Sequence, residues 1–239
     1  QMENGIAFVV PDNARLTQEV LIQPGAIRGA QPGQYVEVQI TQWPTLHRPA
    51  QGEVFEVIGD YMAPGIEIEV ALRSYDIPSV WPQAVLDEAA LLGSQVNDKD
   101  KLKRVDLRHL PLVTIDGEDA RDFDDAVYCE PHKASGWRLF SGGWKLYVAI
   151  ADVSHYVPLG SALDAEAELR GTSVYFPSEV IPMLPEALSN GLCSLNPHVD
   201  RLAMVCEMTI SKTGELTDWQ FYEAVINSHA RLTYNKVAA

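Results

Sequence analysis

Residues 112–130 read LVTIDGEDARDFDDAVYCE, an acidic segment between two apolar runs in the second half of the chain. The runs at its two ends, LVTID and DAVYCE, are apolar and rich in β-formers, which predicts two strands. The segment from Asp116 to Asp125 between them is crowded with acids, namely Asp116, Glu118, Asp119, Asp122, Asp124 and Asp125. The stretch therefore predicts an acidic loop that two strands anchor to a folded core.

Carboxylates this close repel each other and raise one another's pKa unless cations lie near them. Arg121 is the only basic residue of the loop. Oxygen ligands without His or Cys favour a hard divalent ion, so the loop predicts a Mg²⁺ site in which Mn²⁺ can substitute. A calcium-binding EF-hand is excluded, because its sixth position needs Gly and its twelfth Glu, where this sequence has Arg121 and Val127. Carboxylate-held Mg²⁺ is typical of phosphoryl transfer, and a solvated acidic surface loop is the alternative.

The rest of residues 105–239 mixes strand and helix patterns and predicts an α+β domain. Its expected elements are a central strand WKLYVAIADV at 144–153, a helix ALDAEAELR at 162–170, and a hairpin over 203–210 and 216–226 that turns at 212–214. A connector, residues 81–104, precedes this domain, and PQAVLDEAALL at 82–92 predicts a helix that starts near its Pro. Basic residues follow that either meet phosphates or form a solvated surface, namely Lys101, Lys103, Arg104 and Arg108.

Residues 1–80 predict a small barrel of short strands. Five segments alternate apolar and polar residues as half-buried strands do, namely GIAFVV, EVLIQP, GQYVEVQI, GEVFEVIGD and GIEIEVALR. In the third segment, Val36, Val38 and Ile40 are expected on one face. Five strands in this length favour an oligonucleotide-binding (OB-type) barrel, with part of a β-sandwich as the alternative. Aromatic candidates for stacking on bases, half of which should face the core, are Phe8, Tyr35 and Phe55.

The composition of the 239-residue chain is that of a globular protein with a net charge of −15. This charge disfavours a broadly basic nucleic-acid surface but not a local one. The N-terminus lacks a signal-peptide pattern, and no apolar run reaches the roughly 18–20 residues of a membrane helix, so no membrane association is expected. Cys129, Cys193 and Cys206 are scattered, which predicts reduced thiols in a cytoplasmic protein. No glycine-rich phosphate loop occurs, and no organic cofactor is expected.

Long motifs also carry a resemblance to a known family. TIDGEDARDFDDAVYCE resembles the catalytic motif of the ribonuclease II (RNB) family of 3′→5′ exoribonucleases. Further motifs resemble that family in its order, namely VAIADVSHYV, RGTSVYFPSEVIPMLPEALSNGLCSLNP, VDRLAMVCEM and SHARLTY. The part that ends in ALRSYDIPSVWPQAV resembles the family's second cold-shock domain. The resemblance covers nearly the whole chain and implies a cold-shock barrel followed by a partial α+β RNB catalytic domain.

The resemblance implies hydrolytic, processive, Mg²⁺-dependent 3′→5′ degradation of single-stranded RNA that releases 5′-nucleoside monophosphates. The family's four motif aspartates match Asp116, Asp122, Asp124 and Asp125. The resemblance implies that all four aspartates belong to the metal site and that Asp116, Asp122 and Asp125 are its main ligands. It also implies that Asp124 is required for cleavage but not for RNA binding. The family's aromatic residue that stacks on RNA near the 3′ end matches Tyr175, for which the residue pattern alone favours a core tyrosine.

For other polar residues in these motifs, a role in the site has weaker support. His155 is a candidate general base, but a lone His beside a strand is more often structural. Residues expected only to support the site are Asp152, Asn190, Asn196 and Arg201. The family's catalytic domain is longer than this chain, so the resemblance implies a fragment with an incomplete site. An RNA-binding module without catalysis, and a different Mg²⁺-dependent phosphatase or nucleotidyl transferase, are the competing functions.

Overall fold

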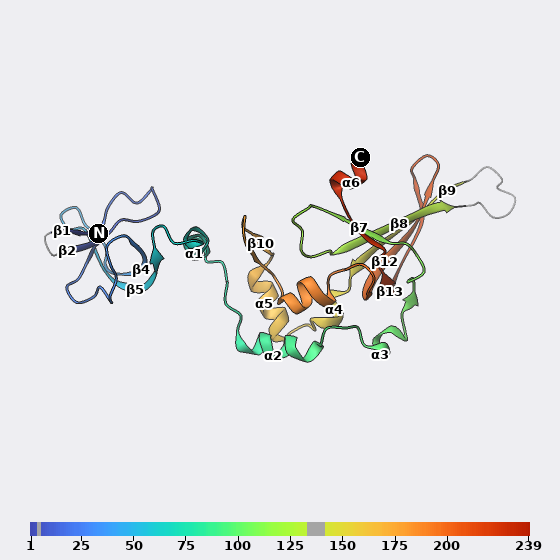
Figure 1. Cartoon of the computed structure of the whole chain (residues 1–239), viewed down its shortest axis with the longest axis horizontal. Helices are drawn as coiled ribbons and strands as arrows, with labels where there is room; N and C mark the ends of the chain where they lie inside the picture. Colours follow the sequence, from blue (N-terminus) through green and yellow to red (C-terminus); the bar gives the residue numbers. More distant parts are fainter. Residues whose placement is uncertain (4–5, 133–141) are drawn as a thin grey trace. The chain divides into compact units, whose positions relative to one another are not determined.

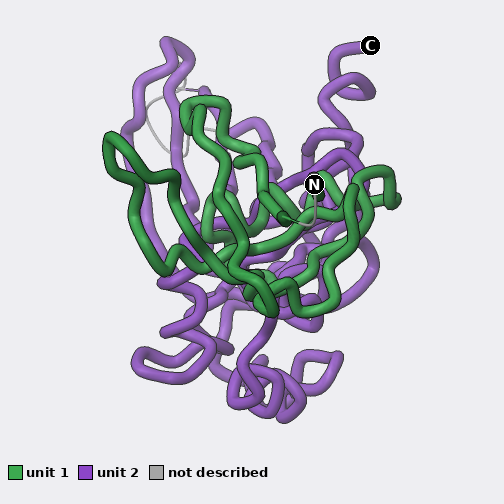
Figure 2. The backbone as a smooth tube through the Cα atoms, turned by 90° about the vertical axis from the view of Figure 1, so that its left-hand side faces the viewer, with its two compact units in different colours: residues 1–79 green, residues 80–239 purple. Residues whose placement is uncertain are grey.

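The chain forms two compact units, residues 1–79 and 80–239, in a computed structural model that describes residues 1–3, 6–132 and 142–239 (Figures 1 and 2). Each unit has its own hydrophobic core. Within the described ranges, no helix combines the length and the apolar character that a membrane crossing requires.

The first unit is built on a five-stranded sheet with the order β1-β2-β3-β5-β4, in which β3 and β5 pair in parallel and the other pairs among the described residues are antiparallel. The strands are β1 (Met2–Glu3), β2 (Ile6–Val9), β3 (Val20–Ile22), β4 (Gln34–Gln42) and β5 (Ala50–Asp60). Val20, Ile22 and Val54 form its core, and Val36, Val38 and Ile40 pack against it as the alternation predicted. The OB-type sheet is confirmed, but it is open: among the described residues, no pairing joins β1 to β4.

The fifth predicted strand, GIEIEVALR, is wrong, because residues Ile66–Ser74 form helix α1. Its charges fit a helix: Glu67 and Glu69 lie in the first turn and Arg73 in the last, where each complements the helix dipole. Arg73 also pairs with Glu69, one helical turn away, at 2.5 Å. The short strand β1 takes the fifth place in the sheet, which places α1 outside the sheet and against β5.

The second unit contains a seven-stranded sheet with the order β14-β7-β8-β9-β12-β13-β6. Its strands are β6 (Val105–Asp106), β7 (Val113–Asp116), β8 (Asp125–His132), β9 (Gly143–Ala151), β12 (Asp200–Ser211), β13 (Leu216–Asn227) and β14 (Ala230–Thr233). The predicted strands on both sides of the acidic loop are therefore β7 and β8, the predicted central strand is β9, and the predicted hairpin is β12–β13. In the turn of this hairpin, the N–H of Gly214 donates to the carbonyl of Ser211. These predictions are confirmed.

Helices and short elements complete this unit. They are α2 (Gln83–Leu92), α3 (Asp98–Lys101), α4 (Val153–Tyr156), α5 (Ala162–Arg170), the short hairpin of β10 (Val174–Tyr175) and β11 (Val180–Ile181), a π-helical segment (Ala187–Leu192) and α6 (Tyr234–Ala238). The helices predicted over 82–92 and 162–170 are α2 and α5, and they pack against each other. Val85, Leu163 and Leu188 share the core of this helical layer.

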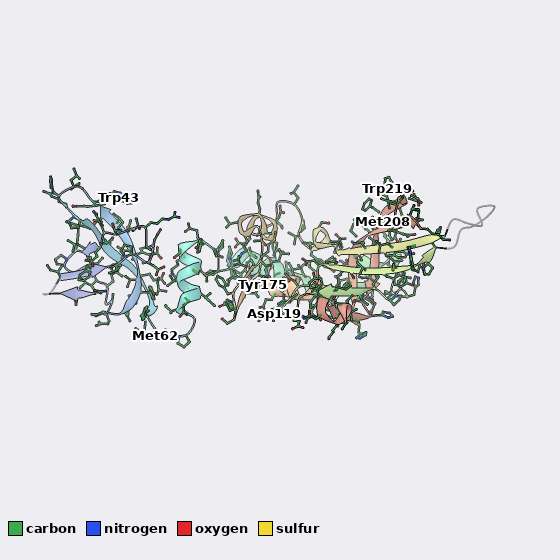
Figure 3. The ribbon with its side chains drawn as sticks, turned by 90° about the horizontal axis from the view of Figure 1, so that it is seen from above. Trp43, Met62, Asp119, Tyr175, Met208 and Trp219 are labelled. Carbon is green, nitrogen blue, oxygen red and sulfur yellow. The ribbon has the colours of Figure 1, made fainter. Side chains whose placement is uncertain are left out.

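The two faces of the sheet in the second unit differ. One face packs into a core that includes Phe123, Ala149, Leu195 and Val205. On the other face, apolar side chains of β9, β12 and β13 lie side by side, because Met208 is paired with Leu146 on one side and with Trp219 on the other. We call this the outer face, and its most exposed members are Trp144, Ile150, Leu216, Trp219 and Phe221. Figure 3 labels Met208 and Trp219 on this sheet.

Candidate functional site

The four motif aspartates lie around the loop between β7 and β8. Asp116 is the last residue of β7 and Asp125 the first of β8. Asp122 and Asp124 flank Phe123, whose ring is buried in the core. Asp122 is half-buried, while Asp124 and Asp125 are exposed. Two strand ends and one buried ring therefore position the four carboxylates.

Backbone hydrogen bonds fix the second half of the loop. The N–H of Phe123 donates to Ser194 Oγ at 3.1 Å, and its carbonyl accepts from Leu195 N–H at 2.8 Å. The next carbonyl, of Asp124, accepts from Ala151 N–H at 2.8 Å. Since backbone groups and a buried ring hold this segment together, Asp122 and Asp124 do not depend on each other for their placement.

The carboxylates influence each other electrostatically. Burial is the main cause that raises the pKa of Asp116, and the charges of Asp125 and Asp122 raise it further, whereas the Thr114 side chain and the charge of Arg231 lower it. Partial burial also raises the pKa of Asp124, to which Asp122, Asp125 and Asp116 add. Asp124 reaches solvent, so this effect comes from the protein atoms that surround part of its side chain. The cluster carries more negative charge than its protein neighbours compensate.

The donor set fits a hard divalent cation. All four side chains offer carboxylate oxygens, which Mg²⁺ prefers, and the buried Oδ2 of Asp116 has no hydrogen-bond partner. However, among the residues that the structure describes, no three His, Cys, Asp or Glu side chains are grouped closely enough to form a ready metal site. The aspartates thus supply suitable ligands and excess charge, but not a preformed coordination shell.

Tyr175 lies next to this loop although it is distant in sequence. From β10, its hydroxyl donates a hydrogen bond to Asp122 Oδ1. Burial, together with the hydrogen bond to Asp122, raises the pKa of Tyr175 to about 12. Its side chain is 49% exposed, so the alternative of a core tyrosine is wrong. Tyr175 and Asp122 line a small crevice together with Arg121, Glu186 and Asn190.

His155 makes its polar contacts elsewhere. Its Nε2 lies 3.4 Å from Asp100 Oδ2, and its Nδ1 lies 3.4 Å from Arg104 Nη2. The buried Asp152 pairs with the same Arg104 Nη2 at 2.6 Å and accepts from the hydroxyl of Ser154. These contacts favour a structural role for both residues, as expected for His155.

Three other motif residues make hydrogen bonds near the loop or at the crevice. The buried Arg201 donates from Nε to the carbonyl of Ser194 at 2.8 Å, and Ser194 in turn holds Phe123. Asn196 donates to the carbonyl of Asn190 at 2.9 Å, which shapes the crevice beside Tyr175. Arg201 therefore acts through Ser194 on the segment that carries Asp122 and Asp124.

The basic residues near the connector are mostly paired with acids. Lys101 lies 2.9 Å from Asp200, Arg104 pairs with Asp152, and Arg108 lies 2.6 Å from Asp106. Lys103 is exposed. Since three of the four cations already have carboxylate partners, their arrangement favours a structural surface over a phosphate-binding one.

Arg231 is the residue near the site that the sequence reasoning missed. Arg121 is the only basic residue within the loop itself, yet Arg231 of β14 donates to two carbonyls of the loop and its charge lowers the pKa of Asp116. A signal was available, because Arg231 lies within SHARLTY, one of the motifs that carry the family resemblance.

Comparisons with known proteins cover both units. The RNB domain family matches residues 104–239, and the cold shock domain family matches residues 8–82. Ribonuclease R of Escherichia coli (strain K12) is 60% identical over 235 residues, which are 98% of this chain and 28% of that protein. Ribonuclease R of Vibrio parahaemolyticus is 58% identical over 238 residues, again 28% of its length.

Solved structures agree with this match. The structure of Mycoplasma genitalium RNase R in complex with double-stranded RNA superimposes with a TM-score of 0.85 at 33% identity, covering 96% of this chain and 40% of that one. The chain thus spans less than half of these relatives.

Proposed function

Because the chain belongs to the RNB domain family, we propose that its protein is a processive 3′→5′ exoribonuclease of the ribonuclease R type. It hydrolyses single-stranded RNA from the 3′ end and releases 5′-nucleoside monophosphates. The observation that carries the proposal is the joint placement of the four motif aspartates around Phe123 with the Tyr175 hydroxyl on Asp122. This arrangement supports phosphodiester chemistry at an oxygen-ligand site beside an exposed aromatic ring.

Each side chain has a proposed role. Mg²⁺, or Mn²⁺ in its place, would be held mainly by Asp116, Asp122 and Asp125, with Asp124 beside them, and would supply Lewis-acid activation of water. Asp124 acts in cleavage rather than in RNA binding. Tyr175 stacks on a base near the 3′ end, and such stacking tolerates any sequence because every base has an aromatic face.

RNA is the proposed partner, and no membrane or organic cofactor is involved. The Mycoplasma genitalium enzyme was solved with double-stranded RNA and with ribose-methylated single-stranded RNA.

In the first unit of this chain, Phe8 is buried in the sheet while Phe55 is 55% exposed, so Phe55 is the better candidate for stacking on a base. All three cysteines are free, which agrees with a cytoplasmic location.

Asp124→Asn tests the proposal in the full-length protein. We expect the rate of nucleotide release to fall by roughly 100-fold or more, while RNA affinity is retained. Asp119→Asn is the matched control, because Asp119 is an exposed acid of the same loop that has no assigned role. The measurements are release of mononucleotides from 3′-tailed RNA with Mg²⁺, and RNA affinity by anisotropy. Normal degradation by Asp124→Asn would remove the role of Asp124.

A second candidate function applies to the chain as it stands: an RNA-binding module that lacks catalysis. The absence of a grouped three-carboxylate site among the described residues favours it. The same RNA assay on the 239-residue chain separates the two functions. Binding without release supports the module, and release of mononucleotides contradicts it.

A further inference from the structure

The first half of the acidic loop, residues 117–121, has few contacts that hold it in place. Within it, Ala120 N–H donates to the carbonyl of Gly117 at a long 3.3 Å. The stronger anchors described above all lie at Phe123 and Asp124. Since the neighbouring carboxylates repel one another, this half of the loop needs an external restraint.

Arg231 supplies that restraint from another strand. β14 runs parallel to β7, with Arg231 opposite Thr114 and Thr233 opposite Asp116. From there Arg231 Nη2 donates to the carbonyl of Glu118 at 3.1 Å and to the carbonyl of Ala120 at 2.9 Å. One guanidinium nitrogen therefore holds two carbonyls of the turn.

The same side chain also reaches the buried anchor of the loop. The guanidinium carbon of Arg231 lies 4.4 Å from the centre of the Phe123 ring, within the range of a cation–π contact. The following helix α6, which lies beside β7 in Figure 1, adds Asn235, whose side-chain amide donates to Glu118 Oε1 at 3.0 Å. Arg231 thus links the loosely held half of the loop to the firmly held half, and Asn235 reinforces the link.

We propose that Arg231 is a positioning residue for the four aspartates, which acts by clamping residues 118–120 onto Phe123. The proposal rests on the proposed function for its catalytic consequence, but not for the clamp itself. Lysine cannot reproduce it, because a single flexible ammonium does not offer a flat face to Phe123 while donating to two carbonyls. A variant that keeps the charge but loses the planar group therefore separates positioning from charge balance.

The test uses the full-length protein with Arg231→Lys and Arg231→Met. Lys236→Met is the matched control, because Lys236 is an exposed cation five residues further along the chain, on α6. The first measurement is hydrogen exchange of the loop amides without metal or RNA. We expect exchange of residues 117–121 to rise about tenfold in Arg231→Met and less in Arg231→Lys, with no change in Lys236→Met.

The second measurement is single-turnover RNA cleavage alongside RNA affinity. We expect cleavage to slow by about 10- to 100-fold in Arg231→Met, because small displacements of reacting groups are costly, while RNA affinity is nearly unchanged. Unaltered exchange in Arg231→Lys would overturn the clamp even if Arg231→Met exchanges faster, because charge alone would then hold the loop. If Arg231→Met does not fold, Arg231→Lys decides alone. Faster loop exchange in a protein whose wild type cleaves no RNA would sustain the clamp and refute the proposed function instead.

Discussion

At the scale of single residues, Tyr175 combines two properties that one substitution pair can separate. Its ring is exposed enough to stack on a base, and its hydroxyl donates to Asp122. We predict that Tyr175→Ala in the full-length protein lengthens the final undegraded RNA fragment, because a stacking contact worth roughly 1–3 kcal/mol is lost. Tyr175→Phe should leave the fragment length unchanged, because the ring remains.

The measurement is the ladder of end products from labelled single-stranded RNA, resolved at single-nucleotide resolution. A ladder that is the same for Tyr175→Ala and the wild type removes Tyr175 from RNA binding. If Tyr175→Phe instead lengthens the fragment as much as Tyr175→Ala, the hydroxyl on Asp122 matters more than the ring.

The concentration of carboxylates in the loop was predictable from sequence, because the acids from Asp116 to Asp125 are neighbours along the chain. The residues around the loop did not predict a partner that comes from a distant strand, and only the family motif SHARLTY pointed to Arg231. Arg121 is the nearest cation in sequence, but the parallel pairing of β14 with β7 places Arg231 over the loop. Parallel pairing of distant segments depends on the whole sheet, and a local pattern carries no information about it.

At the scale of elements, three neighbouring strands of the large sheet are joined by a polar contact. Glu207 of β12 accepts from Lys145 of β9 at 2.5 Å and from the Tyr222 hydroxyl of β13 at 2.7 Å. Burial alone would raise the pKa of Glu207, but the hydrogen bonds from Lys145 and Tyr222 outweigh it and lower the pKa below its ordinary 4.5. The ionised form is therefore favoured in the folded state.

This contact predicts a dependence of stability on pH. A lowered carboxyl pKa stabilises the fold fully above about pH 4.5, and the contribution is lost as pH falls through the lower folded-state pKa. Glu207→Gln should lower the free energy of unfolding by about 1–3 kcal/mol at pH 7, because Lys145 loses its charged partner. On acidification, the free energy of unfolding of this variant should fall less than that of the wild type. Urea unfolding from pH 7 to pH 3 measures this, with the exposed Glu215→Gln as control. Parallel curves for Glu207→Gln and the wild type would contradict the prediction.

Helix α1 shows that a pattern of alternating residues can predict the wrong secondary structure for a short segment. In GIEIEVALR, apolar and polar residues alternate with the period of a strand, and β-branched residues support that interpretation. The helix nevertheless forms, because it buries Ile66 and Leu72 while Glu67, Glu69 and Arg73 complement its ends. The long strands β9, β12 and β13 were predictable because they are long enough for periodicity to dominate over end effects.

At the scale of the whole chain, two opposing forces govern its behaviour in solution. The outer face of the large sheet exposes Trp219 by 59% and Phe221 by 68%, beside Met208 and Leu146. A contiguous apolar surface of this kind favours association between molecules. The net charge of −15 repels identical chains and opposes that association. Added salt screens the charge but does not weaken the apolar attraction.

We therefore predict that the 239-residue chain self-associates more strongly as salt increases from about 0.05 to 0.5 M, where the Debye length falls severalfold. Replacing Trp219 and Phe221 together by Thr should abolish this, because Thr suits a strand but removes the aromatic surface. Trp43→Thr is the control, since Trp43 is 78% exposed but lies on the first unit (Figure 3). Sedimentation velocity at several concentrations measures the effect. If association weakens with salt, or persists unchanged in the double variant, charged contacts rather than the outer face hold the chains together.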